Sequence, residues 1–322
     1  MKILLYSVSR PAAVTLTPDE GNVSVGDRLL RTPAVLEAKG GLVNMKGYGP
    51  SRKSIRVEIQ GKGAWLTGGS SPRRLYKGLL EITAEKGRLK ILNTIPLETY
   101  IAGVVSAEAG DLSQTEAFKA QAVAARTYVL KHMDNHVRDG YNMCDSTHCQ
   151  FFPGFAAVRP IAQAAADFTR GEIVTYRGKP AETFYHSICG GRTETMTAVW
   201  PFGHKPYLIS VRDGPEKKPY CSIAPAFNWK TRISLKTLSA IARARGWILP
   251  EEEIKKMSVA ARGVSRRATT LEFDTGKRMV RIPATRFYHG TGRRAGWNAV
   301  RSTLFEIYSG KNHIIMDVKG KG

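Results

Sequence analysis

Residues 96–108 read Pro-Leu-Glu-Thr-Tyr-Ile-Ala-Gly-Val-Val-Ser-Ala-Glu, and this stretch predicts a helix that starts at the proline and ends before Gly110. Four apolar residues share one face of that helix, at about 100° per residue: Leu97, Ile101, Val104 and Val105. Glu108 falls in the middle of the same face, where a leucine would be expected. Because burying an unpaired carboxylate costs several kcal/mol, this acid must be paired, neutralised or placed at a cleft. A carboxyl group in such a place is a candidate general acid.

The chain before this helix is predicted to be rich in β-strands. Short apolar or alternating runs at Ser54 to Ile59, Ala64 to Thr67, Gly78 to Thr83 and Leu89 to Leu92 are separated by glycine-containing turns. We expect a meander of short antiparallel strands. Residues 1–70 are assigned to an N-terminal β-rich segment and residues 71–322 to the domain that carries the chemistry.

A second helix is expected after the first. Ser113-Gln-Thr-Glu116 has the spacing of a capping box, and the alanine-rich run that follows it to His132 indicates a deeply buried helix. Arg126 lies in the middle of this run. It is expected to pair with Glu108 or with the site around it, or else to emerge at the end of its helical face.

The rest of the chain alternates helices and strands. Helices are predicted at about Pro160 to Thr169 and at Leu235 to Arg245, and strands at 173–176, 270–273, 279–282, 304–308 and 313–318. Residues 251–256 are expected to form a charged turn, and residues 286–301 a loop rich in glycine and arginine. The pattern predicts an α+β fold with central helices packed on mixed or antiparallel strands. It is compatible with one large domain or with two intimately packed lobes.

The four cysteines are Cys144, Cys149, Cys189 and Cys221. Their even number fits two disulfides, one metal site plus a pair, or four inert thiols. Cys144 and Cys149 lie five residues apart with His148 between them and His136 upstream, which could supply soft ligands for zinc. A local disulfide, a pair of core thiols and a catalytic thiol remain alternatives.

A dense polar loop is expected in the segment from Thr183 to Glu194, which contains Gly190-Gly191. Polar side chains beside two glycines suit a place where the backbone approaches a ligand, although a hairpin turn would give the same pattern.

The chain is strongly basic. Its net charge is +22, and from Lys230 to the end 20 Lys and Arg face 7 Asp and Glu. This balance indicates an anionic partner such as nucleic acid, a membrane, a wall polymer or an acidic glycan, or else a solvated basic surface that aids solubility. No RNP-like motif, finger spacing or basic heptad region is present, so we expect no specific nucleic-acid partner.

No window of the sequence approaches the roughly 18 consecutive apolar residues that span a bilayer. The apolar start, residues 1–7, is too short for the centre of a signal peptide. If the protein is exported, its signal or any membrane anchor is expected to lie outside this sequence.

Five segments together resemble the stage II sporulation protein D family, which includes the amidase enhancer of a major autolysin. The similarity runs from about Arg73 to the C-terminus. The segments are Gly78-Leu-Leu-Glu-Ile, Ile95 to Glu108, Glu116 to Tyr128, Cys144 to Phe152 and His186 to Glu194.

The resemblance implies a peptidoglycan lytic transglycosylase. Such an enzyme cleaves between N-acetylmuramic acid and N-acetylglucosamine in glycan strands freed of stem peptides, and leaves 1,6-anhydro ends. The family's catalytic glutamate falls on Glu108, which would act as acid and then as base. The alternative is a non-catalytic wall-binding protein that stimulates a wall amidase. Either role implies an exported protein of the cell envelope, with peptidoglycan strands as partner.

The resemblance also implies further site residues. A structural zinc ion would be held by His136, Cys144 and Cys149, with His148 as the substitute for His136. Positions expected near the saccharide are Arg126, Gln150, His186, Ser187, Gly190, Gly191, Arg192, Thr193 and Glu194. In an exported protein, Cys189 and Cys221 could form a disulfide.

In the family, a stretch of the Gly-x-Gly-His-Gly-Val-Gly type comes near the C-terminus. This sequence ends at Gly320-Lys-Gly322, where that stretch is expected to begin. Either the sequence is truncated at this end, or the protein lacks a wall of the cleft that the family pattern contains, and in both cases we do not expect full activity from this chain.

Overall fold

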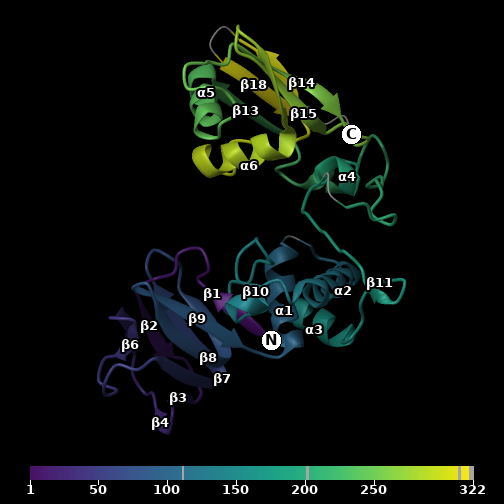
Figure 1. Ribbon diagram of the computed structural model, residues 1–322. Helices are drawn as coiled ribbons and strands as arrows, with labels where there is room; N and C mark the ends of the chain where they lie inside the picture. Colours follow the sequence, from purple (N-terminus) through teal and green to yellow (C-terminus); the bar gives the residue numbers. More distant parts are fainter. Residues whose placement is uncertain (111, 201–202, 311–312, 319–322) are drawn as a thin grey trace. The chain divides into compact units, whose positions relative to one another are not determined.

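The computed structural model describes residues 1–322 except 111, 201–202, 311–312 and 319–322 (Figure 1). Helices and strands mix along the chain, which confirms the predicted α+β class. The chain divides into two compact units, unit 1 (Met1–Tyr185) and unit 2 (His186–Gly322). Residues 320–322, where the glycine-rich stretch of the family is expected to begin, lie outside the described part.

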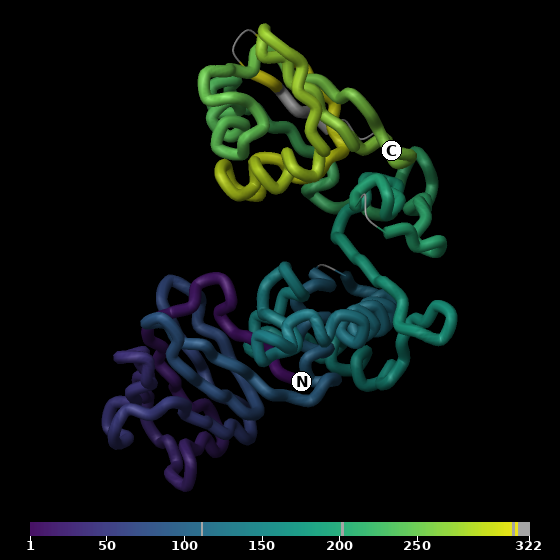
Figure 2. Tube along the Cα trace, viewed as in Figure 1, coloured from purple at the N-terminus to yellow at the C-terminus, as the bar shows by residue number. Residues whose placement is uncertain are grey.

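Unit 1 is built on a large, mostly antiparallel sheet with the strand order β10-β1-β9-β8-β7-β2-β5-β6, and with β3 and β4 at its side. The first strand of the chain lies between β9 and β10, and its pairing with β10 is parallel (Figure 2). The strands are β1 (Lys2–Leu5), β2 (Ala13–Pro18), β3 (Val23–Val25), β4 (Arg28–Leu29), β5 (Ala34–Lys39), β6 (Leu42–Met45), β7 (Ser54–Gly68), β8 (Arg74–Glu85), β9 (Arg88–Thr94) and β10 (Met143–Cys144).

The prediction of only short strands is wrong at β7. The runs at 54–59 and 64–67 belong to one 15-residue strand, and the register with β8 shifts between Ile59 and Ala64. Gly61 and Gly63 supply the bulge, with φ angles of +79° and +140°. A Cβ on Gly63 would lie 2.8 Å from the Tyr76 carbonyl oxygen, so the glycine permits a close approach that continues the strand. The expected boundary near residue 70 falls in the connection between β7 and β8.

Three helices of unit 1 pack on one another: α1 (Leu97–Glu108), α2 (Thr115–His132) and α3 (Pro160–Phe168). They share one core with the sheet, in which Ile101, Phe118 and Phe152 are fully buried. The positions of α1 and α3 agree with the predictions. The predicted capping box is wrong, because α2 starts at Thr115 with Gln114 as its N-cap and no side-chain cap bond.

A short 3-10 helix, η1 (Val137–Asp139), follows α2. The strand expected at 173–176 is present only as β11 (Thr175–Tyr176), which forms a small hairpin with β12 (Lys179–Pro180).

Unit 2 contains two three-stranded antiparallel sheets, β13-β18-β17 and β14-β15-β16. Their strands are β13 (Trp229–Ser234), β14 (Lys256–Arg262), β15 (Ala268–Asp274), β16 (Met279–Pro283), β17 (Glu306–Ser309) and β18 (His313–Val318). Its helices are α4 (Met196–Val199), the 3-10 helix η2 (Tyr220–Ile223), α5 (Leu235–Ala244) and α6 (Ala284–Ala295). The predicted strands near β15, β16, β17 and β18 are found, whereas the sequence did not predict β14.

The expected loop at 286–301 is also corrected, because most of it is α6. Gly290 and Gly292 lie in this helix. A Cβ on Gly290 would lie 2.6 Å from the ring of Trp247, and a Cβ on Gly292 would lie 2.3 Å from the ring of Trp297. The glycines therefore admit two tryptophan rings against the helix, and this packing outweighs their low helix propensity.

Among the described residues, no helix combines the length and the apolar character that a membrane crossing requires.

Candidate active site

Glu108 is the last residue of α1, and the helix fixes its position through its buried face. Ile101, Val104 and Val105 are fully buried, whereas Glu108 is only half-buried. Glu108 thus lies at the end of the buried apolar face, where the helix surface becomes accessible to solvent. Its Oε1 atom accepts a hydrogen bond of 2.8 Å from the backbone N–H of Phe151. This bond orients the carboxylate and leaves Oε2 available for a second partner.

The loop after Cys149 brings Gln150 to the same part of unit 1. Gln150 is 1% exposed, and its Nε2 donates to the Ala125 carbonyl oxygen at 3.3 Å and to the Tyr185 hydroxyl at 2.9 Å. Its Oε1 has no hydrogen-bond partner among the described residues. Gln150 is therefore buried, and it orients the Tyr185 hydroxyl.

Tyr185 is a site residue that the sequence did not single out. Burial raises the pKa of its hydroxyl, and the negative charge of Glu108 raises this pKa further, while the bond from Gln150 opposes the shift. The hydroxyl therefore stays protonated at neutral pH and can serve as a hydrogen-bond donor beside Glu108. The polar character of 183–194 was a signal, but nothing distinguished this tyrosine from its neighbours.

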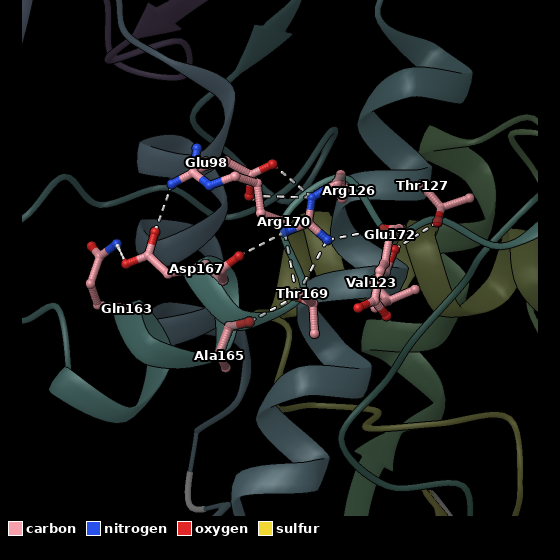
Figure 3. Close-up of polar contacts among 11 residues, drawn as sticks. Glu98, Val123, Arg126, Thr127, Gln163, Ala165, Asp167, Thr169, Arg170 and Glu172 are labelled. Atoms are coloured by element: carbon pink, nitrogen blue, oxygen red, sulfur yellow. Dashed lines mark hydrogen bonds and ion pairs between the residues drawn. The ribbon is translucent and has the colours of Figure 1, made fainter.

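Arg126 does not pair with Glu108, so that prediction is wrong. Its guanidinium forms a two-point ion pair with Glu98 in the first turn of α1, with Nη2–Oε2 at 2.6 Å and Nε–Oε1 at 3.0 Å (Figure 3). It also donates to the carbonyl oxygens of Ala166 and Glu172. Arg126 thus joins α1 and α2 to the C-terminal end of α3.

The proposed contact of Arg126 with a saccharide is also contradicted. The side chain is 1% exposed, and all three of its nitrogens donate to groups inside unit 1. Figure 3 shows it enclosed between the helices. Its role is therefore structural, because a buried cation requires these partners to offset its lost hydration.

The residues predicted to bind zinc do come together in unit 1, and His148 joins them. The Sγ atoms of Cys144 and Cys149 are 3.3 Å apart. Cys149 Sγ lies 3.5 Å from His136 Nε2 and 3.5 Å from His148 Nδ1, and Cys144 Sγ lies 3.8 Å from His148 Nδ1. We call His136, Cys144, His148 and Cys149 the four-ligand cluster.

Three members of the four-ligand cluster, His136, His148 and Cys149, have ligand atoms that all lie within 4.8 Å of one another, and Cys144 adjoins them through Cys149 and His148. Zn–S bonds of about 2.3 Å and Zn–N bonds of about 2.0 Å in a tetrahedron place neighbouring ligand atoms about 3.3–3.8 Å apart. The hydrogen bond between the two thiols lowers the pKa of Cys144, so the pair favours formation of one thiolate. Three of these four residues are the predicted ligands, with His148 as the substitute for His136, whereas the geometry brings both histidines to the site.

The loop that carries the cluster is anchored by Asp145, a residue that the sequence pattern did not indicate. This buried carboxylate accepts hydrogen bonds from the backbone N–H groups of Tyr6 and Ser7, and it pairs with Arg74 at 2.8 Å. The loop 144–151 is thereby fixed to the sheet on one side and presents the Phe151 N–H to Glu108 on the other.

The other predicted saccharide residues belong to unit 2. Glu194 accepts hydrogen bonds from Ser265 and from the backbone N–H of Thr195, and these lower its pKa although burial alone would raise it. Thr193 bonds to the backbone of Val211. Both side chains therefore have internal roles.

His186 and Ser187 are exposed and line a cavity of about 280 Å³ in unit 2. Arg192, beside them in the loop, donates from Nε to the Ser210 hydroxyl. Gly190 has φ +68°, and a Cβ there would lie 2.5 Å from Leu304, while Gly191 has φ +94°. The two glycines thus allow the turn that the sequence suggested.

Comparison with known proteins identifies the class of domain that holds Glu108. Residues 85–176, which include α1, α2, the four-ligand cluster and α3, match the family model described as a stage II sporulation protein. This segment of the chain is thus similar to the stage II sporulation protein D family.

Individual relatives extend this result. The chain is 27% identical over 284 residues to stage II sporulation protein D of Bacillus amyloliquefaciens, and this aligned region covers 79% of each of the two proteins. It is 33% identical over 137 residues to an uncharacterized protein of Brachyspira hyodysenteriae, covering 42% of this chain and 37% of that one. It is 30% identical over 138 residues to the amidase enhancer of Bacillus subtilis, covering 43% of this chain and 17% of that one. The match thus spans well under half of the last two relatives.

Proposed function

We propose that this protein is a peptidoglycan lytic transglycosylase that uses Glu108 as its single acid and base. The observation that carries the proposal is the half-buried Glu108 carboxylate, held at the end of α1 by the Phe151 N–H within the segment that matches the family. A single carboxylate suffices when the attacking hydroxyl belongs to the substrate, because no second carboxylate is then needed to activate water.

The proposed reaction has two proton transfers. Protonated Glu108 gives its proton to the glycosidic oxygen while the bond from that oxygen to C1 of N-acetylmuramic acid breaks. The 6-hydroxyl oxygen of the same sugar then bonds to C1, and the Glu108 carboxylate takes the hydroxyl proton. The products are a 1,6-anhydro end and a new free hydroxyl on the departing saccharide, so water is neither consumed nor released.

The neighbours of Glu108 support this use. The Phe151 N–H stabilises charge on Oε1 and fixes the plane of the carboxylate, which leaves Oε2 to carry the proton. Tyr185 remains a neutral donor and can hold a sugar oxygen beside Glu108. Gln150 acts through Tyr185 as a positioning residue.

The four-ligand cluster would hold a zinc ion with a structural role. With all four positions of a tetrahedron filled by protein, such a site closes a loop and leaves no place for a reacting water. The loop it closes contains Phe151, whose N–H orients Glu108. Zinc would therefore affect the reaction only indirectly, because it would fix the position of Phe151, whose N–H orients the Glu108 carboxylate.

The charge of the chain supports an anionic substrate. Glycan strands without stem peptides expose the lactyl carboxylates of muramic acid, and a protein of net charge +22 attracts them. This proposal places the protein outside the cytoplasmic membrane, in the cell envelope, with glycan strands as its partner.

The direct test of this function uses purified sacculi, one half treated with a wall amidase. We expect soluble saccharides with 1,6-anhydro ends, detected by mass spectrometry, chiefly from the amidase-treated half. Release of saccharides with ordinary reducing ends would contradict the proposed chemistry.

A second function is favoured by the similarity to the amidase enhancer. In that case the protein would bind wall glycan and stimulate an amidase without cleaving the glycan. The two functions separate in one experiment: a Glu108→Gln variant would lose glycan cleavage in the first case, and would keep full amidase stimulation in the second.

Tyr185→Phe tests the site around Glu108. The variant removes the hydroxyl that Gln150 binds, and with it a donor beside Glu108. A lost hydrogen bond of about 1.4 kcal/mol corresponds to a roughly tenfold slower cleavage. We expect this decrease in kcat, with little change in Tm. An unchanged rate would remove Tyr185 from the site.

Removal of zinc is expected to destabilise unit 1. A ligand present at a hundred times its Kd stabilises the fold by about 2.7 kcal/mol. For 150–250 residues this corresponds to a fall in Tm of about 5–11 °C. We expect this fall after treatment with a chelator, and recovery with zinc but not with magnesium. A chelator-resistant Tm, together with a Cys144–Cys149 cystine in the mass spectrum, would contradict the zinc site.

A further inference from the structure

A second group of ligand-type side chains lies entirely within unit 2. Cys189, Asp213 and Cys221 come from three separate segments, yet their sulfur and carboxylate oxygen atoms all lie within 4.8 Å of one another. The two Sγ atoms are 3.6 Å apart. These residues, which we call the Cys-Asp-Cys cluster, border the 280 Å³ cavity that His186 also lines.

The spacing of the cluster suits a metal. Two thiolates on a tetrahedral zinc ion stand about 3.8 Å apart, since each Zn–S bond is about 2.3 Å. A disulfide between the same sulfurs would require them to approach to about 2.05 Å. It would also leave the Asp213 carboxylate without a ligand role beside the two sulfurs.

The backbone holds Asp213 in place. Its Oδ2 accepts a hydrogen bond of 2.9 Å from the backbone N–H of Cys221. The carboxylate therefore lies beside the two cysteine sulfurs, and two thiolates with one carboxylate form a donor set that zinc accepts.

The surroundings balance the charge of a filled site. Two thiolates, one carboxylate and a divalent cation have a net charge of −1. Arg267 donates to the Cys189 carbonyl oxygen and interacts electrostatically with both cysteines. Its positive charge offsets the excess negative charge of the assembled site.

The segment that contains the cluster has little regular structure to stabilise it. Between His186 and Asn228, the described chain has only one-turn helices, α4 and η2, and an isolated bridge between Arg192 and Arg212. A segment with so little regular structure gains stability from a metal or a covalent link. The Cys-Asp-Cys cluster joins its beginning, its middle and its end.

We propose that Cys189, Asp213 and Cys221 form a second zinc site, with His186 or water as the fourth ligand. The site binds zinc or a similar divalent cation that accepts thiolates. It holds the loop that carries Ser187 and the two glycines. This proposal does not depend on the glycan-cleaving reaction, because it concerns metal content alone.

The test is the metal content of the full chain, purified under reducing conditions without added metal and then exposed to zinc. We expect about two zinc ions per chain by native mass spectrometry, and about one after Cys189→Ser with Cys221→Ser. Asp213→Asn should weaken the second zinc by at least about tenfold. Cobalt(II) in place of zinc should show thiolate charge-transfer absorption that falls by about half in the double serine variant.

The matched control is Asp274→Asn, which changes a half-buried carboxylate of the same unit whose Oδ1 accepts a hydrogen bond from the Gly276 N–H. It should leave the zinc content unchanged. An unchanged zinc content in the double serine variant would overturn the proposal. So would a Cys189–Cys221 disulfide in the wild-type chain as it is isolated from its natural compartment.

Discussion

Glu108→Gln is expected to slow release of 1,6-anhydro saccharides about a hundred- to ten-thousandfold, the range typical of a lost general acid and base. Glutamine keeps the size of the side chain, and its Oε1 can still accept the hydrogen bond from the Phe151 N–H. It cannot donate a proton to a leaving oxygen or accept one from a hydroxyl. The loss should therefore appear in kcat, with substrate binding and Tm nearly unchanged.

Glu116→Gln is the matched control for this variant. Glu116 lies in the first turn of α2, its side chain is 82% exposed, and it pairs only with Lys119 among the ion pairs described. Its activity should equal that of the wild type. Equal product profiles for Glu108→Gln and the wild type would exclude Glu108 as the acid and base.

Arg126→Met is expected to cost about 3–5 kcal/mol of unfolding free energy, the usual effect of breaking a buried ion pair from one side. Methionine fills much of the space but leaves the Glu98 carboxylate buried at 12% exposure without its cation. It also removes the donors to Ala166 and Glu172. Three helices thereby lose their shared link.

Chemical denaturation of the Arg126→Met variant measures this cost. Arg170→Met is the control, because the Arg170–Asp167 pair is exposed on both sides and should contribute less than about 1 kcal/mol. The double variant Arg126→Met with Glu98→Leu should be more stable than Arg126→Met alone, since it no longer buries an unpaired charge. A loss of less than about 1 kcal/mol in Arg126→Met would contradict the structural role of this residue.

The sequence predicted the part of the site that depends on local pattern. The apolar face of α1 and the place of Glu108 on it follow from helical periodicity alone. The partner of Arg126 depends instead on the direction of packing. A short connection between α1 and α2 favours antiparallel helices, which sets a residue late in α2 beside Glu98 rather than Glu108.

Other features could not be predicted, because they rest on contacts between distant segments. The helix α6 forms in spite of its glycines because Trp247 and Trp297 pack against them. In the Cys-Asp-Cys cluster, Asp213 lies 24 positions after Cys189 and 8 positions before Cys221, in a segment with little regular structure. No known sequence spacing links an aspartate to two cysteines in this way. The division of the chain after Tyr185 likewise has no marker in composition.

Digestion of peptide-free glycan strands in oxygen-18 water distinguishes attack by the substrate's own hydroxyl from attack by water. We expect 1,6-anhydro ends that carry no oxygen-18, formed by the wild type and lost in Glu108→Gln. Reducing ends that contain oxygen-18 would show that water attacks, and would exclude the proposed role of Glu108 in an intramolecular attack.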